Sequence, residues 1–242
     1  MNRLHPDENT LNAQISSLVV DCIETGERLP TEEEMMEKFN VSRTQLRKEL
    51  NIFEANGIIV SQQGSGRHVQ APDIGAQIVG TWSLLIQAKP ALLLDLMEIR
   101  SMLEISTIPM VLEKITIDQL HSLAYQISEM KRKAEQKKTF AKNDREFHRV
   151  LYLCMDNVLL SQLMGAFWDL YDKSKIESYH EGLVELAAQH EEMLDAIIHK
   201  DAERLKTLMR EQHEDARYQI IMSLVNSDGD SRDEHKHLIS GV

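Results

Sequence analysis

The sequence predicts a mainly α-helical protein, in which an N-terminal unit of three helices and one β-hairpin precedes an all-α bundle of about seven helices. Strand-like residues with a glycine-rich turn occur once, at residues 58–69. Beyond residue 73, apolar residues recur at helical spacing, and caps and breakers divide them into segments. We therefore expect two units, residues 1–72 and 73–226, and a disordered polar tail at residues 227–242.

The composition is typical of a soluble globular protein, with 42% hydrophobic and 27% charged residues in a chain of 242. No apolar run approaches the roughly 18 residues of a membrane span, and the polar start lacks the apolar core of a secretory signal. Cys22 and Cys154 lie in apolar helical patterns, as small buried residues of a reducing compartment do. We expect a cytoplasmic protein with no membrane partner.

The first predicted helix follows Thr10, a suitable N-cap, and ends at Gly26, a suitable C′ residue. A second helix begins at the capping box Thr31-x-x-Glu34. Its short apolar stripe consists of Met35, Met36 and Phe39.

A third helix begins after a tight turn, at the capping box Ser42-x-x-Gln45, and ends at Asn56-Gly57. Its apolar stripe consists of Leu46, Leu50 and Phe53. Two short helices joined by a tight turn are typical of a helix-turn-helix. The following strands and the Gly64-Ser65-Gly66 turn predict a wing.

The net charge of −12 argues against nucleic-acid binding, but the charge is not uniform. Residues 41–70 hold four lysine or arginine residues against two glutamates, and salt screens charges beyond about 10 Å. Arg43 and Arg47, four residues apart, share the helix face opposite the apolar stripe. The alternative is a protein-interaction module of the same shape. We expect DNA contacts from Thr31, Ser42, Arg43, Thr44, Arg47, Gly64, Gly66, Arg67 and His68.

The segment LPTEEEMMEKFNVSRTQLRKELNIFEANGIIVSQQGSGRHV resembles the winged helix-turn-helix of GntR-family bacterial transcription regulators. The matching residues are Leu29-Pro30, Val41-Ser42-Arg43, Arg47, Gly57, Gly64 and Gly66. The resemblance implies that Arg43 and Arg47 contact DNA and that the wing enters the minor groove. Glu33 stands where the family usually has arginine, so the contact of that arginine has no counterpart here.

The remaining chain predicts a helical bundle. The expected helices lie near 74–88, 91–114, 117–137, 139–155, 158–180, 182–200 and 202–225. The expected caps and breakers are Pro90, Thr116, Thr139, Asn157, Gly182 and Asp201.

Four polar side chains point inward on three of these helices. Asp144 and His148 are four residues apart on an apolar face, and His190 and His213 lie on apolar stripes of their own. Burying such groups unpaired costs several kcal/mol, so we expect them to meet. Three imidazoles and a carboxylate suit a divalent transition metal; the alternative is an internal hydrogen-bond cluster.

The same four residues extend the resemblance to the ligand-binding domain of the FadR subfamily, in which many members hold a metal with one aspartate and three histidines. The resemblance implies a metal site at Asp144, His148, His190 and His213. Zinc is the first expectation, while manganese or nickel would suit a site with more than four donors.

Arg100 also lies on an apolar stripe, where it has two interpretations of equal weight. It can pair with Glu104, four residues later, or bind a carboxylate ligand through its planar fork. We therefore predict a homodimeric regulator that binds a double-stranded operator, a divalent metal and a small organic or sugar acid. The alternatives are a metal-dependent hydrolase and a sensor of the metal itself.

Overall fold

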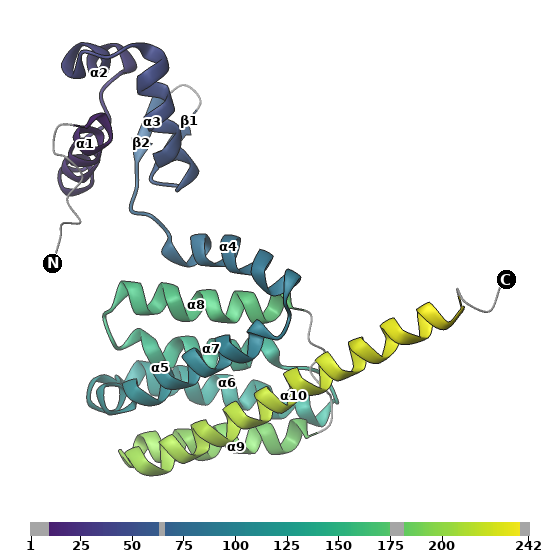
Figure 1. The fold of residues 1–242 in the computed structure, drawn as a ribbon. Coiled ribbons are helices and arrows are strands. Elements are labelled where there is room, and N and C mark those ends of the chain that lie inside the picture. The colour runs from purple at the N-terminus through teal and green to yellow at the C-terminus, as the bar shows by residue number, and fades with distance from the viewer. Residues whose placement is uncertain (1–9, 63–65, 175–181, 238–242) are drawn as a thin grey trace, which may run out of the picture. The chain divides into compact units, whose positions relative to one another are not determined.

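The computed structural model describes residues 10–62, 66–174 and 182–237, with side chains as far as residue 226. The chain forms two compact units, Met1–Asp73 and Ile74–Val242, which are coloured along the chain in Figure 1. Among the described residues, helices dominate both units, and the only sheet has two strands. The predicted fold class is confirmed.

The N-terminal unit contains three helices and a hairpin. Its elements are α1 (Leu11–Thr25), α2 (Glu32–Phe39), α3 (Arg43–Ala55), β1 (Ile59–Gln62) and β2 (Gly66–Val69). The two strands pair antiparallel, with Ser61 opposite Arg67. Both predicted capping boxes form, and each fixes the first turn of its helix through two reciprocal hydrogen bonds.

Apolar stripes of the three helices and one strand residue form the core of this unit. The fully buried members are Ile15, Met35, Leu46, Leu50 and Ile59. Because Leu46 and Leu50 fill one face of α3, the opposite face of that helix is exposed. The packing therefore presents Arg43 and Arg47 to solvent.

The second unit contains only helices among its described residues, as the sequence predicts. They are α4 (Ile74–Ala88), α5 (Leu92–Lys114), α6 (Ile117–Glu135), α7 (Ala141–Leu153), α8 (Val158–Lys173), α9 (Leu183–Ile198) and α10 (Ala202–His237). Side-chain caps at Thr116 and Asn157 begin α6 and α8. No described helix is long and apolar enough to cross a membrane.

Six of the seven helices differ from their expected bounds, by one or two residues at an end except in α8 and α10. Helix α8 is expected to reach residue 180 but ends at Lys173, and residues 175–181 lie outside the described part.

Helix α7 begins later than expected: the buried Phe140 occupies the N-cap position. The predicted cap Thr139 lies one residue earlier, where its Oγ1 accepts a hydrogen bond from the backbone of Ala141. The backbone of α10 continues to His237 over most of the expected tail, since each added residue of a formed helix adds one hydrogen bond. Residues 238–242 lie outside the described part.

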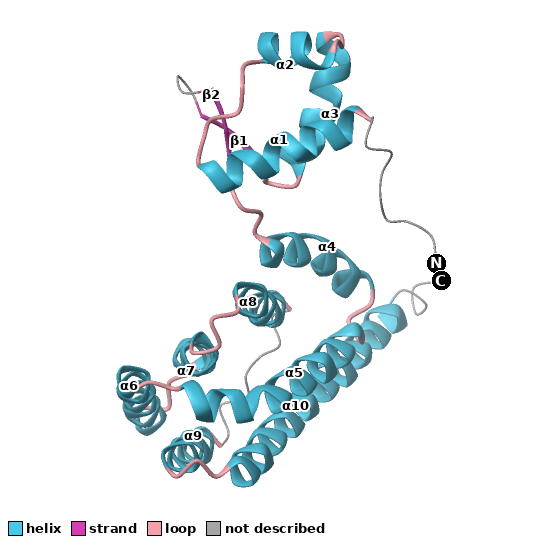
Figure 2. Ribbon diagram, turned by 90° about the vertical axis from the view of Figure 1, so that its left-hand side faces the viewer, coloured by secondary structure: helices cyan, strands magenta, loops and turns pink. Residues whose placement is uncertain are grey.

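The helices of the second unit pack around one core. Helices α6, α7, α8 and α9 are seen nearly end-on in Figure 2, while α5 and α10 run alongside each other. Helix α6 contacts both α7 and α9, and α4 lies on α8. The polar residues of interest therefore come from α5, α7, α9 and α10, which surround one part of this core.

Candidate DNA interface and candidate metal and effector site

The N-terminal ends of α2 and α3 carry the predicted DNA-binding residues. Thr31 and Ser42 are the N-cap residues, whose hydroxyls accept hydrogen bonds from the backbone of Glu34 and Gln45. Arg43 opens α3 and Arg47 lies one turn later, with side chains 51% and 56% exposed. Thr44, between them, is also exposed.

One carboxylate holds three arginines of this surface together. Arg47 Nε donates to Glu32 Oε2 at 2.9 Å, and Arg67 Nη1 donates to Glu32 Oε1 at 2.5 Å. Arg43 Nε lies 3.7 Å from Glu32 Oε2. The hydrogen bonds from Arg47 and then Arg67 lower the pKa of Glu32. Sequence reasoning missed this residue, because Arg67 approaches it from the wing, 35 positions away.

The wing residues lie on β2. Gly66 opens the strand with φ of 84°, a conformation that favours glycine, and Arg67 Nε donates to Glu54 Oε1 at 2.7 Å. His68 is paired with Val60 across the hairpin. Gly64 lies outside the described residues, so its predicted role at the tip of the wing stays a prediction.

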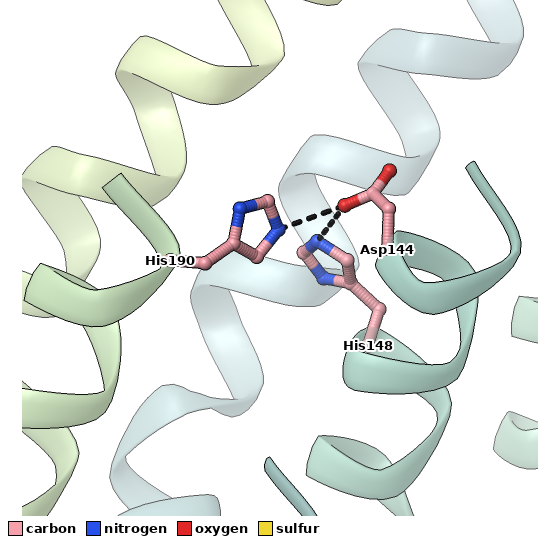
Figure 3. Close-up of side chains that lie close together, drawn as sticks. All are labelled: Asp144, His148 and His190. Atoms are coloured by element: carbon pink, nitrogen blue, oxygen red, sulfur yellow. Dashed lines mark hydrogen bonds and ion pairs between the residues drawn. The ribbon is translucent and has the colours of Figure 1, made fainter. Parts of the chain in front are cut away.

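Three of the four predicted metal ligands meet in the second unit. Asp144 and His148 lie one turn apart on α7, and His190 comes from α9 (Figure 3). Asp144 Oδ1 lies 2.8 Å from His190 Nε2 and 3.6 Å from His148 Nε2. One potential ligand atom of each residue falls within 4.8 Å of the other two, which is the spacing that a shared cation needs.

The protonation of His190 points the same way. Its Nδ1 lies 2.8 Å from the Leu186 carbonyl oxygen, which can only accept, so Nδ1 carries the proton. Its Nε2 atom lies 2.8 Å from Asp144 Oδ1 and 3.0 Å from the Gln212 amide nitrogen. A histidine with one ring nitrogen held by a carbonyl and the other facing a carboxylate oxygen has the arrangement of a metal ligand, in which the metal would replace the proton between Nε2 and that oxygen.

His213 makes a different contact from the other three. Its Nε2 donates to Glu104 Oε2 at 2.7 Å, so this nitrogen carries a proton. The same carboxylate accepts from Arg100 Nε at 2.9 Å through its other oxygen. His148 Nδ1 lies 3.9 Å from Glu104 Oε2, so Glu104 connects His213 to the three-residue cluster. To ligate through Nε2, His213 would have to leave Glu104.

The charges of this region follow from burial and from the neighbouring cations. Burial by itself would raise the pKa of Glu104, but Arg100, His148 and His213 lower it well below its usual range. Burial would also raise the pKa of Asp144, but the hydrogen bond with His190 outweighs this effect and the pKa is lowered. Burial lowers the pKa of His148 to about 4, against the opposing effect of Glu104 and Asp144. The region therefore holds two carboxylates and a neutral His148 at neutral pH.

A cavity of about 430 Å³ opens beside these residues. Its lining includes Arg100, Asp144, His148, Trp168, Tyr171 and Gln219. The Arg100 guanidinium lies 3.8 Å from the centre of the Trp168 ring, so the two planar groups form one wall. Arg100 pairs with Glu104, as the first interpretation expects, and it also lines the cavity. That it binds a carboxylate ligand stays a prediction.

Sequence reasoning missed Glu104, Trp168 and Gln212 as members of this region. In the sequence, Glu104 is recognisable only as a possible partner of Arg100. The structure shows that Glu104 is fully buried, so this part of the interior is polar. Gln212 precedes His213 and gives no comparable signal.

Two family models match the chain. Residues 9–69 match the bacterial regulatory proteins of the gntR family, and residues 95–214 match the FCD domain. The chain is a GntR-family transcription regulator of the FadR subfamily. Its family and relatives are DNA-binding regulators, so the enzymatic alternative does not hold.

Characterised and uncharacterised relatives of this GntR-family chain share about a quarter of its residues. The uncharacterised regulator YcbG of Bacillus subtilis is 26% identical over 90% of this chain and 93% of its own. The repressor NanR of an Enterobacter species is 27% identical over 73% of this chain and 70% of its own. The solved structure of Streptococcus agalactiae GntR has a TM-score of 0.63 and 22% identity, covering 90% of this chain and all of that one, which supports the same fold.

Proposed function

We propose that this regulator binds a near-palindromic operator as a two-fold homodimer, and that its helical unit holds one divalent metal and a small organic or sugar acid that changes operator binding. The observation that carries the proposal is the cluster of Asp144, His148 and His190, of which Asp144 and His148 line a cavity that Arg100 also lines. Such a protein acts in the cytoplasm, where a bacterial chromosome lies.

Operator binding is assigned to α3 and the wing. Arg43 and Arg47 are half exposed, and their carboxylate partners can be exchanged for phosphates or base edges at little cost. The wing contributes Gly66, Arg67 and His68 to the assignment, which also includes Gly64, outside the described residues. A single recognition helix reads few bases, which is the reason to propose two copies on two half-sites.

The metal is assigned to Asp144, His148 and His190, with His213 as the fourth ligand once it leaves Glu104. The residues fit a metal, since an ionised carboxylate and two imidazole nitrogens converge and His190 has its second nitrogen held by a carbonyl. Zinc suits four such donors; manganese or nickel would suit a site completed by water or ligand oxygens. When bound, the metal would supply a positive charge for an anionic ligand.

The effector is assigned to the cavity beside the metal ligands. A volume of about 430 Å³ suits a small metabolite. Among the described residues, only Nε of the Arg100 guanidinium has a hydrogen-bond partner, so its other nitrogens remain for a carboxylate. Together with the metal, Arg100 favours an acid over a neutral sugar, because both would attract its negative charge.

Titration calorimetry with a panel of small organic and sugar acids tests this assignment. Binding should be lost after chelation and weakened in Arg100→Lys, which keeps the charge but lacks the planar fork. Arg149→Ala, on the exposed side of α7, is the matched control and should bind normally. Equal affinity in all these proteins would place the effector elsewhere. Operator affinity that responds to the metal alone, with no acid bound, would make the protein a metal sensor instead.

A further inference from the structure

Glu32 and Glu33 are neighbours in the first turn of α2, but their surroundings differ. The Glu32 side chain is 12% exposed and is engaged by Arg43, Arg47 and Arg67. The Glu33 side chain is 70% exposed, and its carboxylate accepts a hydrogen bond from Arg43 Nη2. Glu32 therefore holds the arginines from the less exposed side, whereas Glu33 contacts the terminal nitrogen of Arg43.

The contact places a carboxylate at the reading end of the recognition helix. Arg43 is the first residue of α3, and its Nε faces Glu32 while its Nη2 contacts Glu33. A base edge that meets the outer nitrogens of Arg43 would thus lie beside the Glu33 oxygens. Donor and acceptor are presented side by side, on an exposed surface, at the position where the proposed interface meets the bases.

A carboxylate at this position has a defined preference. It is repelled by phosphates, and it can accept a hydrogen bond only from a base that carries an amino group. In the major groove, cytosine offers its N4 amino group to glutamate, while arginine donates to guanine O6 and N7. A side-by-side arginine and glutamate therefore match a guanine and a cytosine at the same or neighbouring positions.

We propose that Glu33 is a specificity-determining residue, which selects a cytosine beside the guanine read by Arg43. This inference rests on the proposed DNA interface. The opposing possibility is that Glu33 only neutralises Arg43, as many exposed ion pairs do, and that it weakens binding to all sequences alike.

Selection from a random double-stranded DNA library by the full chain distinguishes the two. The wild type, Glu33→Ala, Glu33→Arg and Arg43→Ala are compared at one salt concentration. Glu24→Gln is the control, because it removes an equal charge from an exposed residue of α1. Wild type and control should select the same half-site, with one cytosine that both Glu33 variants no longer require.

The size of this preference is the ratio of two affinities, one for the selected duplex and one for a duplex changed at that cytosine. The change should weaken wild-type binding about tenfold and leave Glu33→Ala, which has no acceptor, nearly unaffected. Glu33 variants that select the wild-type half-site and bind every duplex more tightly would overturn the inference. If Arg43→Ala also selects the same half-site with wild-type affinity, the proposed DNA interface is wrong. If Arg43→Ala loses binding while the Glu33 variants still select the wild-type half-site, the interface stands and only the role of Glu33 is wrong.

Discussion

Each unit of this regulator gathers several basic side chains around one carboxylate, but the two carboxylates differ in exposure. Glu32 in the winged unit contacts Arg43, Arg47 and Arg67, of which the first two are half exposed. Glu104 in the helical unit contacts Arg100 and His213 and is fully buried, as Arg100 nearly is.

The difference in exposure decides what each cluster can do. Exposed ion pairs contribute little to stability, so arginines can turn from Glu32 towards DNA at low cost. A buried cation cannot leave its carboxylate without another anion, because removing one partner costs several kcal/mol. We therefore expect Arg100 to leave Glu104 only when a ligand supplies a replacement negative charge, as the proposed acidic effector would.

Glu104→Ala tests the difference between the two carboxylates with the largest expected loss of stability. The substitution leaves Arg100 buried without its carboxylate, and we expect the free energy of unfolding to fall by about 3–5 kcal/mol in urea denaturation. Glu98→Ala, at an exposed position of the same helix, should change it by less than about 0.5 kcal/mol. Equal effects of the two substitutions would show that Glu104 does not hold this region together.

Metal removal should have the next largest effect. A ligand present at about 100 times its Kd adds about 2.7 kcal/mol to the native state, so chelation should lower the Tm of the metal-loaded protein. Asp144→Asn should bind less metal and lose most of this response, whereas Asp195→Asn on α9 should retain it. A Tm that is the same before chelation, after it and after refilling would favour a hydrogen-bond cluster without metal.

Arginine substitutions in the winged unit should weaken DNA binding without weakening the fold. We expect Arg43→Ala and Arg47→Ala each to reduce the free energy of operator binding by about 1–3 kcal/mol at fixed salt, with an unchanged Tm. Arg149→Ala in the helical unit serves as the control. Operator affinity should also fall steeply with salt, since phosphate contacts release counterions. Unchanged affinity in both variants would remove α3 from the interface.

Local interactions made most of the fold predictable from the sequence. The boxes at Thr31 and Ser42 and the cap at Thr116 join residues three positions apart, so the sequence itself contains both partners. Thr139 lies one residue before the N-cap position of α7, which the buried Phe140 occupies. Bounds set by tertiary packing are not visible in a local pattern.

The sites were predictable only as faces of helices. Periodicity shows that Asp144, His148, His190 and His213 point inward, but it does not say which of them meet. The bond between His213 and Glu104 joins residues 109 positions apart, through the packing of α10 against α5. Likewise, the contact of Arg67 with Glu32 depends on how the wing folds back onto α2. The sequence therefore does not predict that Glu32 and Glu104 each contact several basic side chains.

Glu32→Gln should change the free energy of unfolding least, and the pH dependence of this change compares Glu32 with Glu104. The bonds from Arg47 and Arg67 lower the pKa of Glu32 in the folded protein below its unfolded value. A lowered folded pKa gives stability that is present above the unfolded pKa and lost as pH falls through the folded one. Because Arg43 and Arg47 are half exposed, and only Arg67 is mostly covered, we expect the substitution to cost at most about 1 kcal/mol at pH 7.

The measurement is urea denaturation of wild type and Glu32→Gln from pH 7 down through the carboxyl range. The difference between the two proteins should shrink as the pH falls below the usual glutamate pKa, because the protonated Glu32 then resembles glutamine in charge. Glu37→Gln, on the same helix and equally charged, should show a smaller difference at every pH. A wild-type advantage of several kcal/mol at neutral pH would mean that the arginines are held as tightly by Glu32 as Arg100 is by Glu104. The arginines would then not be free to exchange Glu32 for DNA.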